Sequence, residues 1–219
     1  MYAIKEAFYS LQGEGARAGR ASVFCRFTGC NLWSGREQDR GKSVCRFCDT
    51  DFIGTDGQNG GRFADADSVA DHILSLWPAT VVGGTPYVVF TGGEPLLQLD
   101  PPLVEAMHAR GFEIAVETNG TLVPPAGLDW ICVSPKGTSE LKLIRGHELK
   151  LVYPQDDAPP ERFAALDFDH FFLQPMDLAP RGQHDPATAE SVMAETVAYC
   201  LAHPQWRLSL QTHKIAGID

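Results

Sequence analysis

The hydrophobic positions of the chain gather into short runs that are rich in β-branched and aromatic side chains. Continuous runs of this kind are typical of strands buried on both faces of a parallel sheet. Beyond Tyr87 the runs recur mostly every twenty to thirty residues, which leaves room for a crossover between parallel strands. We predict strands over residues 22–27, 87–91, 113–118, 130–134, 149–153, 170–174 and 207–211.

Helical patterns are fewer than strand patterns. We predict helices over residues 68–76 with Asp67 as the N-cap, 102–109 ended by Gly111, and 186–202 with Asp185 as the N-cap. The crossover at residues 122–129 contains Pro124 and Pro125 and is too broken for a full helix. The pattern therefore indicates an α/β fold that forms an open, partial TIM-like barrel with reduced helices.

Length and composition are those of one globular domain over residues 1–219, because no Pro/Gly/Ser-rich linker divides the chain. Residues 54–61 (GTDGQNGG) are expected to form a flexible surface loop. The formal net charge of -10 argues against binding to nucleic-acid phosphates. The N-terminus lacks a secretory signal and no apolar run could cross a membrane. We expect a cytoplasmic protein that acts on small molecules.

Three cysteines suggest a metal centre. Cys30 follows the first predicted strand, and Cys45 and Cys48 come after an insertion at residues 31–44. Three thiolates fill three corners of a cubane iron–sulfur cluster and leave one iron free to bind a small molecule. The spacing therefore predicts a cluster with an open coordination site.

A structural zinc site is the alternative, with Cys25 as the fourth thiolate. Cys25 lies in the middle of a predicted strand, so its side chain is expected to face the core instead. Cys132 and Cys200 lie in apolar stretches and are expected to be core residues.

Polar motifs follow several predicted strands, at the edge of the sheet where parallel α/β folds bind ligands. They are Thr91-Gly92-Gly93-Glu94-Pro95, Glu117-Thr118-Asn119-Gly120, Ser134-Pro135-Lys136, Gln174-Pro175-Met176-Asp177 and Gln211-Thr212-His213-Lys214. A further glycine-containing segment, Ser10-Leu11-Gln12-Gly13-Glu14-Gly15, lies near the N-terminus. Taken singly, each motif is equally typical of a turn or a surface loop.

Taken together, the cysteines and these motifs resemble the radical S-adenosylmethionine (SAM) enzymes. The long first gap, Cys-x14-Cys-x2-Cys followed by Asp49 and Thr50, resembles a branch of the 7-carboxy-7-deazaguanine synthases. The resemblance runs from Gln12 to Lys214 and implies a partial barrel of the β6/α3 type.

The resemblance implies a [4Fe-4S] cluster held by Cys30, Cys45 and Cys48, with SAM on the fourth iron. The implied SAM-binding residues are Gly92, Gly93, Glu94, Ser134, Pro135, Lys136, Gln174, Pro175, Met176 and Asp177. Among them, Glu94 and backbone carbonyls would hold the SAM ammonium, and Lys136 would neutralise its carboxylate. Glycine at residues 92 and 93 would let the backbone approach the ligand closely.

The implied substrate-binding residues are Leu11, Gln12, Gly13, Glu14, Arg26, Thr91, Glu117 and His213. Arg26 lies on the strand face opposite Cys25 and suits a bidentate grip on a carboxylate. Glu117 would accept from ring nitrogens. The resemblance also implies Mg²⁺ held by Thr50 and substrate oxygens, although a cap or turn role for Thr50 is equally consistent with the sequence.

The implied reaction is a radical ring contraction of 6-carboxy-5,6,7,8-tetrahydropterin to 7-carboxy-7-deazaguanine, with release of ammonia, in queuosine biosynthesis. The enzyme would be a carbon–nitrogen lyase and a homodimer, served by an electron donor such as a flavodoxin or ferredoxin. A radical SAM activase of a glycyl-radical enzyme and a non-enzymatic zinc module are the alternatives. The charged insertion at residues 31–44 would form a solvated loop or dock the electron donor.

Overall fold

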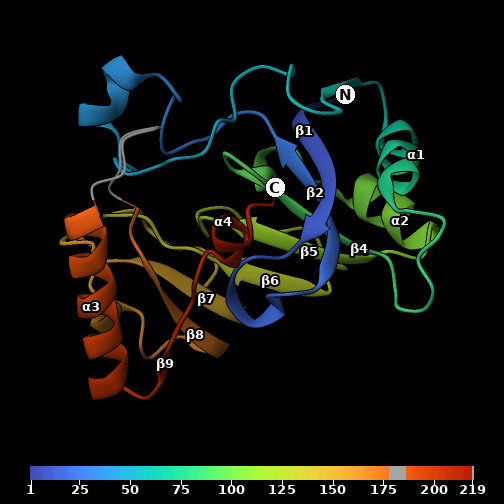
Figure 1. Cartoon of the computed structure of the whole chain (residues 1–219). Helices are drawn as coiled ribbons and strands as arrows, with labels where there is room; N and C mark the ends of the chain where they lie inside the picture. The colour runs from blue at the N-terminus through green and yellow to red at the C-terminus, as the bar shows by residue number, and fades with distance from the viewer. Residues whose placement is uncertain (178–185, 219) are drawn as a thin grey trace.

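A single open sheet forms the body of the molecule (Figure 1). The structure is a computed structural model and describes residues 1–177 and 186–218. The strands are β1 (Tyr2–Leu11), β2 (Ala21–Phe27), β3 (Gly61–Phe63), β4 (Tyr87–Gly92), β5 (Glu113–Thr118), β6 (Trp130–Val133), β7 (Arg145–Tyr153), β8 (Asp167–Pro175) and β9 (Trp206–Leu208). Their order is β3-β1-β2-β4-β5-β6-β7-β8-β9. From β2 to β9 each neighbouring pair is parallel, whereas β1 is antiparallel to both β2 and β3. The predicted open, partial barrel is confirmed.

The helices lie on the outer face of the sheet and at one end of it (Figure 1). They are α1 (Ala66–Leu76), α2 (Pro101–Ala109), α3 (Pro186–Ala202) and α4 (Thr212–Ala216). Short 3₁₀ turns are η1 (Gly15–Arg17), η2 (Glu37–Lys42), η3 (Pro95–Leu97) and η4 (Pro160–Arg162). Helices α1 and α2 pack against each other beside the N-terminal strands, and α3 packs on β8 and β9.

Two apolar layers fill the space between the sheet and its outer helices. The first contains outward-facing residues of the N-terminal strands, such as Val88 and Phe90, packed under α1 and α2. The second lies under α3 and contains Leu149, Leu151 and Trp206. The alternate residues of the same strands face inward, where Tyr87, Val89 and Ala115 form an apolar base. The carboxyl-terminal end of the inner face is therefore left for polar residues.

The segment after β1 brings the two ends of the open sheet together. Thr212, which follows β9, donates from both its backbone N–H and its hydroxyl to the carbonyl of Gly13, each over 2.9 Å. Gly15 N–H donates to the hydroxyl of Ser209 over 3.0 Å, and Ala16 N–H donates to Glu148 on β7. Polar contacts thus span the gap that a closed barrel would fill with a strand ladder.

The structure differs from the predicted elements mainly at the N-terminus. Strand β1 was not predicted, because Lys5 and Glu6 interrupt its apolar residues and a bulge between Ile4 and Glu6 shifts its register. The loop at residues 54–61 is tied to β1 and is not a free excursion: Gly57 N–H donates to the carbonyl of Lys5 over 3.0 Å. Strand β3 begins at the end of this loop.

The helix caps are also partly corrected. Asp65, not Asp67, caps α1, because its carboxylate accepts from the backbone of Ser68 while the Ser68 hydroxyl completes a capping box. Asp100 caps α2. The predicted bounds of α3 are confirmed, and its predicted cap Asp185 lies outside the described residues.

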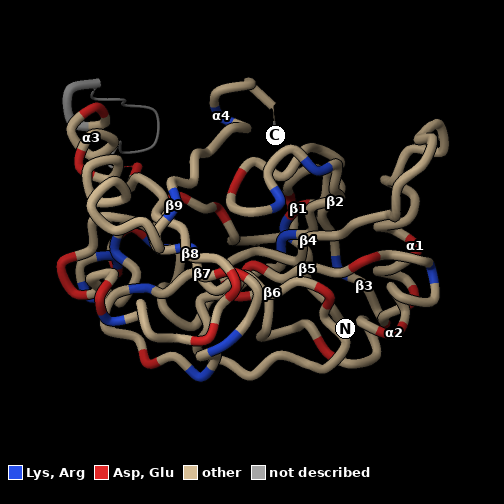
Figure 2. Tube along the Cα trace, turned by 90° about the horizontal axis from the view of Figure 1, so that it is seen from below, with Lys and Arg blue, Asp and Glu red and all other residues tan. Residues whose placement is uncertain are grey.

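Charged residues of both signs are distributed along the trace in Figure 2, in keeping with the formal net charge of -10. No helix among the described residues is long and apolar enough to span a lipid bilayer.

Asp100 is expected to contribute more to stability than an ordinary cap. Its carboxylate accepts from Leu103 N–H at the start of α2 and from the hydroxyl of buried Tyr2 over 2.6 Å. Asp100→Ala should lower the free energy of unfolding by about 2 kcal/mol, about half from the cap and half from the stranded hydroxyl. Asp65→Ala, which removes only a cap, should cost about 1 kcal/mol. Urea unfolding measures both, and equal losses would show that the Tyr2 contact contributes nothing.

Candidate active site

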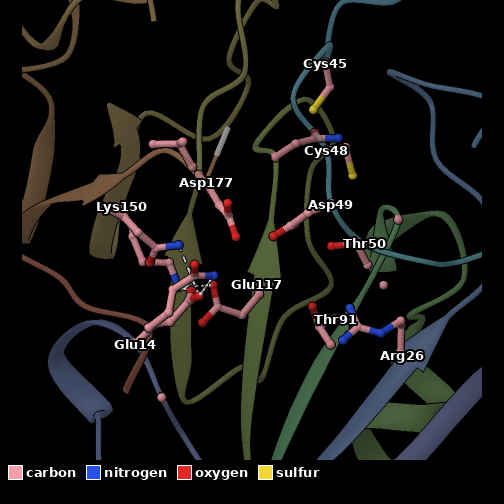
Figure 3. Close-up of a pocket in the computed structure, with 18 of the residues that line it drawn as sticks. Glu14, Arg26, Cys45, Cys48, Asp49, Thr50, Thr91, Glu117, Lys150 and Asp177 are labelled. Carbon is pink, nitrogen blue, oxygen red and sulfur yellow. Dashed lines mark hydrogen bonds and ion pairs between the residues drawn. The ribbon is translucent and has the colours of Figure 1, made fainter. Parts of the chain in front are cut away.

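A cavity of about 430 Å³ opens at the carboxyl ends of the parallel strands (Figure 3). Its size is typical of small-molecule sites. Of the predicted site residues, the cavity is lined by Leu11, Gln12, Gly13, Glu14, Arg26, Cys30, Cys45, Cys48, Thr50, Thr91, Gly92, Gly93, Glu117, Ser134, Lys136, Gln174, Pro175, Met176, Asp177 and His213. Segments far apart in the sequence therefore line one cavity.

Glu94 and Pro135 lie behind the cavity wall and do not line it. The Glu94 carboxylate is fully buried and accepts from the Thr118 hydroxyl over 2.7 Å and from the backbone N–H of Asn119 over 2.8 Å. Burial raises the pKa of Glu94, against these hydrogen bonds. The prediction that Glu94 contacts a ligand ammonium is therefore not supported, because its carboxylate instead ties the end of β4 to the end of β5.

The two glycines of the same motif are needed for packing within the protein. A Cβ on Gly93 would lie 2.2 Å from the carbonyl oxygen of Gly29 and 2.8 Å from the Cβ of Cys30. Gly92 has φ +143°, and a Cβ on this residue would be similarly close to the backbone of Phe27. The segments that carry Phe27 and Cys30 approach these glycines closely, so glycine is needed here for packing, and both glycines also line the cavity as predicted for a ligand contact.

The three predicted thiols lie in the cavity wall. A hydrogen bond from Cys45 lowers the pKa of Cys48, although burial opposes the shift. Burial raises the pKa of Cys30, whose sulfur accepts from Leu32 N–H. Thiols with one acidic member suit metal binding, because the thiolate is the ligand.

Cys25 lies in the core. It is fully buried, and on the neighbouring strands its register partners are Ala7 and Phe90. The zinc site that required Cys25 as a fourth ligand is therefore wrong. Within the described ranges, no three His, Cys, Asp or Glu side chains are grouped to chelate a single metal ion.

Lys150 forms the floor of the cavity, and the sequence analysis missed it. Its ammonium lies 2.8 Å from Glu14 Oε2 and 2.9 Å from Glu117 Oε2, and its side chain is only 5 % exposed (Figure 3). It projects inward from β7, between Leu149 and Leu151, which face the outer core. A lysine within an apolar strand was the available signal.

Amide side chains complete this floor. Gln211 and Gln174 both donate to Glu14 Oε1, over 2.9 and 3.1 Å, and Gln12 donates to Glu117 Oε1 over 3.3 Å. Burial would raise the pKa of Glu14, but the charge and hydrogen bonds of Lys150 and Gln211 outweigh it and lower the pKa to about 2. Two carboxylates share one ammonium, so the floor suits a ligand edge that donates hydrogen bonds.

Arg26 and Thr91 occupy the opposite wall (Figure 3). They are register partners on β2 and β4, so their side chains point to the same face. Arg26 Nε donates to Glu6 Oε1 over 2.7 Å. Glu6 was not predicted as a site residue. Because its carboxylate already accepts from the Arg26 guanidinium, a ligand carboxylate would have to compete with it.

The segment after β9 contacts the mouth of the cavity. The His213 ring lies so close to Gly13 that a Cβ there would be 2.1 Å from Nδ1. Lys214 Nζ lies 2.9 Å from Asp177 and 3.3 Å from Asp49. Burial lowers the pKa of His213, which favours the neutral ring. This segment thus contacts the 10–15 segment, the Gln174 motif and the residue after Cys48.

Comparisons with known proteins agree with this geometry. A family model described as Radical SAM superfamily matches residues 39–153. The 7-carboxy-7-deazaguanine synthase of Bordetella pertussis is 63% identical over 220 residues, and that of Bradyrhizobium diazoefficiens is 64% identical over 217 residues; each match covers 99% of both chains. The chain belongs to the 7-carboxy-7-deazaguanine synthase family.

The fold of this family is seen in a solved relative. The crystal structure of QueE from Escherichia coli superposes with a TM-score of 0.64 at 25% identity, covering 95% of this chain and 93% of that one. Membership in the radical SAM superfamily implies a [4Fe-4S] cluster and SAM. The synthase chain fits such a cluster, because three thiols line one cavity beside the end of β4.

Cys45→Ala should abolish stable cluster binding, whereas Cys25→Ala should not. Wild-type protein reconstituted anaerobically should hold about four irons with equal sulfide, and Cys45→Ala should fall below about one. Cys25→Ala is the matched control, because that thiol is confined to the core. Iron and acid-labile sulfide analysis with EPR measures the outcome, and a Cys45→Ala protein with an intact four-iron signal would refute the ligand set.

Lys150→Met should destabilise the protein by about 3 kcal/mol at neutral pH, because it leaves two largely buried carboxylates without a counter-ion. The pKa of Glu14, about 2, lies below its ordinary value of 4.5, so the stability that Glu14 contributes is present above pH 4.5 and lost as pH falls towards 2. The variant should lose this pH dependence. Urea unfolding between pH 2 and 7 measures it.

Lys214→Met is the control for this experiment. Its side chain is 44% exposed between two acidic partners, so its loss should change stability by less than about 1 kcal/mol. Indistinguishable effects of the two variants would contradict the role of Lys150.

Proposed function

We propose that the chain converts 6-carboxy-5,6,7,8-tetrahydropterin into 7-carboxy-7-deazaguanine, the product for which its relatives are named, with release of ammonia. One observation carries the proposal: a single cavity combines three thiols with a floor of buried carboxylates and an arginine on the opposite wall. The thiols suit a redox centre, and the polar walls suit a flat heterocycle that carries a carboxylate.

Cys30, Cys45 and Cys48 would hold the cluster, and the cavity wall beside them would hold SAM. When bound, this pair supplies a carbon radical that abstracts hydrogen. The chain orients the methionine and adenosine moieties with Ser134, Lys136 and the 174–177 segment. Glu94 acts by positioning the β4 and β5 ends that carry the contacting backbone. The protein thus supplies geometry for a reaction whose chemistry is the cofactor's.

The two charged walls would orient the pterin. Glu117 and Glu14, which both pair with Lys150, accept from the N–H groups of its aminopyrimidine edge. Arg26 binds the carboxylate at the other end, in exchange for its present contact with Glu6. In Figure 3 Arg26 lies on one side of the cavity and Glu14 lies with Lys150 on the other, so the two grips face each other.

Thr50 would hold Mg²⁺ together with substrate oxygens and water, which agrees with the few protein ligands that magnesium uses. His213 would contact the substrate from the mouth, beside the backbone of residues 11–14. A flavodoxin or ferredoxin donor, a homodimer and a cytoplasmic location remain predictions. The buried ionic floor favours a small polar ring over the peptide backbone that a glycyl-radical activase would bind.

Anaerobic turnover tests the proposal. Reconstituted protein with SAM, 6-carboxytetrahydropterin, Mg²⁺ and a reductant should release 7-carboxy-7-deazaguanine and ammonia, and chelation of Mg²⁺ should slow the reaction.

Arg26→Gln should raise KM for the pterin at least about tenfold with a smaller change in kcat, because a charge-assisted grip is lost. Glu6→Gln, which removes the competing carboxylate, should leave KM equal or lower. SAM cleavage without any deazaguanine product would refute the proposed reaction.

A further inference from the structure

The insertion between Cys30 and Cys45 contains a side chain that reaches back to the cysteine turn. Arg40 lies in η2, and its Nη1 donates to the carbonyl oxygens of Arg46 and Cys48, each over 3.0 Å. Residues 45–50 have no helical or strand hydrogen bonds of their own. Arg40 therefore supplies donors to a turn whose carbonyls have no partner within a regular element.

Arg40 is itself held in place by the insertion. Its Nε donates to Glu37 Oε2 over 2.7 Å, and a second nitrogen contacts the other oxygen of the same carboxylate. The guanidinium stacks 4.1 Å from the ring centroid of Trp33, which is buried edge-on against Phe52. A planar group that is stacked on one face and hydrogen-bonded along its edges has few other conformations, so the turn it binds is ordered as well.

The guanidinium also places a permanent positive charge one hydrogen bond from Cys48. Reduction of a cluster held by these cysteines adds a negative charge, and a nearby cation favours the reduced form. Lysine at this position would keep the charge but could not donate two hydrogen bonds from one plane while stacking on Trp33. The ordering and the charge effects can therefore be separated by substitution.

We propose that Arg40 is a positioning residue for the cluster: it orders the 45–48 turn before iron binds and raises the reduction potential of the bound cluster. The inference rests on the proposed cysteine ligand set and explains what the long insertion contributes. The insertion thus holds the 45–48 turn in place, which refines the expectation that it forms a solvated loop. Arg40 does not touch substrate or SAM in this account.

Hydrogen exchange of the cluster-free protein tests the ordering. In Arg40→Met and Arg40→Lys, amides of residues 45–50 should exchange at least about tenfold faster than in the wild type, while β4 to β8 stay protected and report an intact fold. Lys42→Met is the matched control, because it removes an exposed cation from the same 3₁₀ turn. It should leave exchange unchanged.

Redox titration of the reconstituted proteins tests the charge. Arg40→Met should lower the midpoint potential, by about 59 mV if the reduction equilibrium changes tenfold, whereas Arg40→Lys and Lys42→Met should stay near the wild type. Both Arg40 variants should lose iron to a chelator faster. Wild-type exchange, iron retention and potential in Arg40→Met would overturn the inference.

These readouts do not depend on the identity of the substrate. If the wild type formed no deazaguanine but Arg40→Met showed the faster exchange and the lower potential, the proposed reaction would fail and the role of Arg40 would stand. If turnover succeeded and Arg40→Met behaved as the wild type, the proposed reaction would stand and the role of Arg40 would fail.

Discussion

The structure depends on closing an open sheet without a closing strand. Strand β1 pairs with β2 and β3, strand β9 pairs with β8, and among the described strands no backbone ladder joins these two ends of the sheet. The segment after β1 bridges the gap instead, with Glu14 accepting from Lys150, Gln174 and Gln211 and with Gly13 accepting from Thr212. Buried polar groups must be paired, so this bridge specifies one arrangement of the two ends.

The same contacts build the site, because the bridge is also the floor of the cavity. Lys150 neutralises carboxylates from two segments that would otherwise repel each other in a poorly hydrated space. Lys214 has the same role at the mouth of the cavity, where its ammonium pairs with both Asp49 and Asp177. Segments that are distant in sequence are therefore held together by shared ion pairs.

Several residues that a motif would assign to the ligand instead position the protein around it. Glu94 is buried and joins two strand ends, and Gly93 makes room for the segment of Cys30. Arg40, which belongs to none of these motifs, holds the cysteine turn from within the insertion. Positioning residues of this kind occur within or beside ligand-binding motifs, because a ligand can be bound only if the loops around it are held at fixed distances.

The sequence by itself determined the parallel strands, the outer helices and the family, because apolar runs and strand-end motifs are local signals that every parallel sheet presents at one edge. It also determined that Cys25 and Arg26 face opposite ways, since strand alternation is a local property. Only the tertiary structure decided that Lys150 lies between Glu14 and Glu117, that Glu6 pairs with Arg26, and that Glu94 turns away from the cavity. Each of these depends on which strands become neighbours, and no residue's own sequence context contains that information.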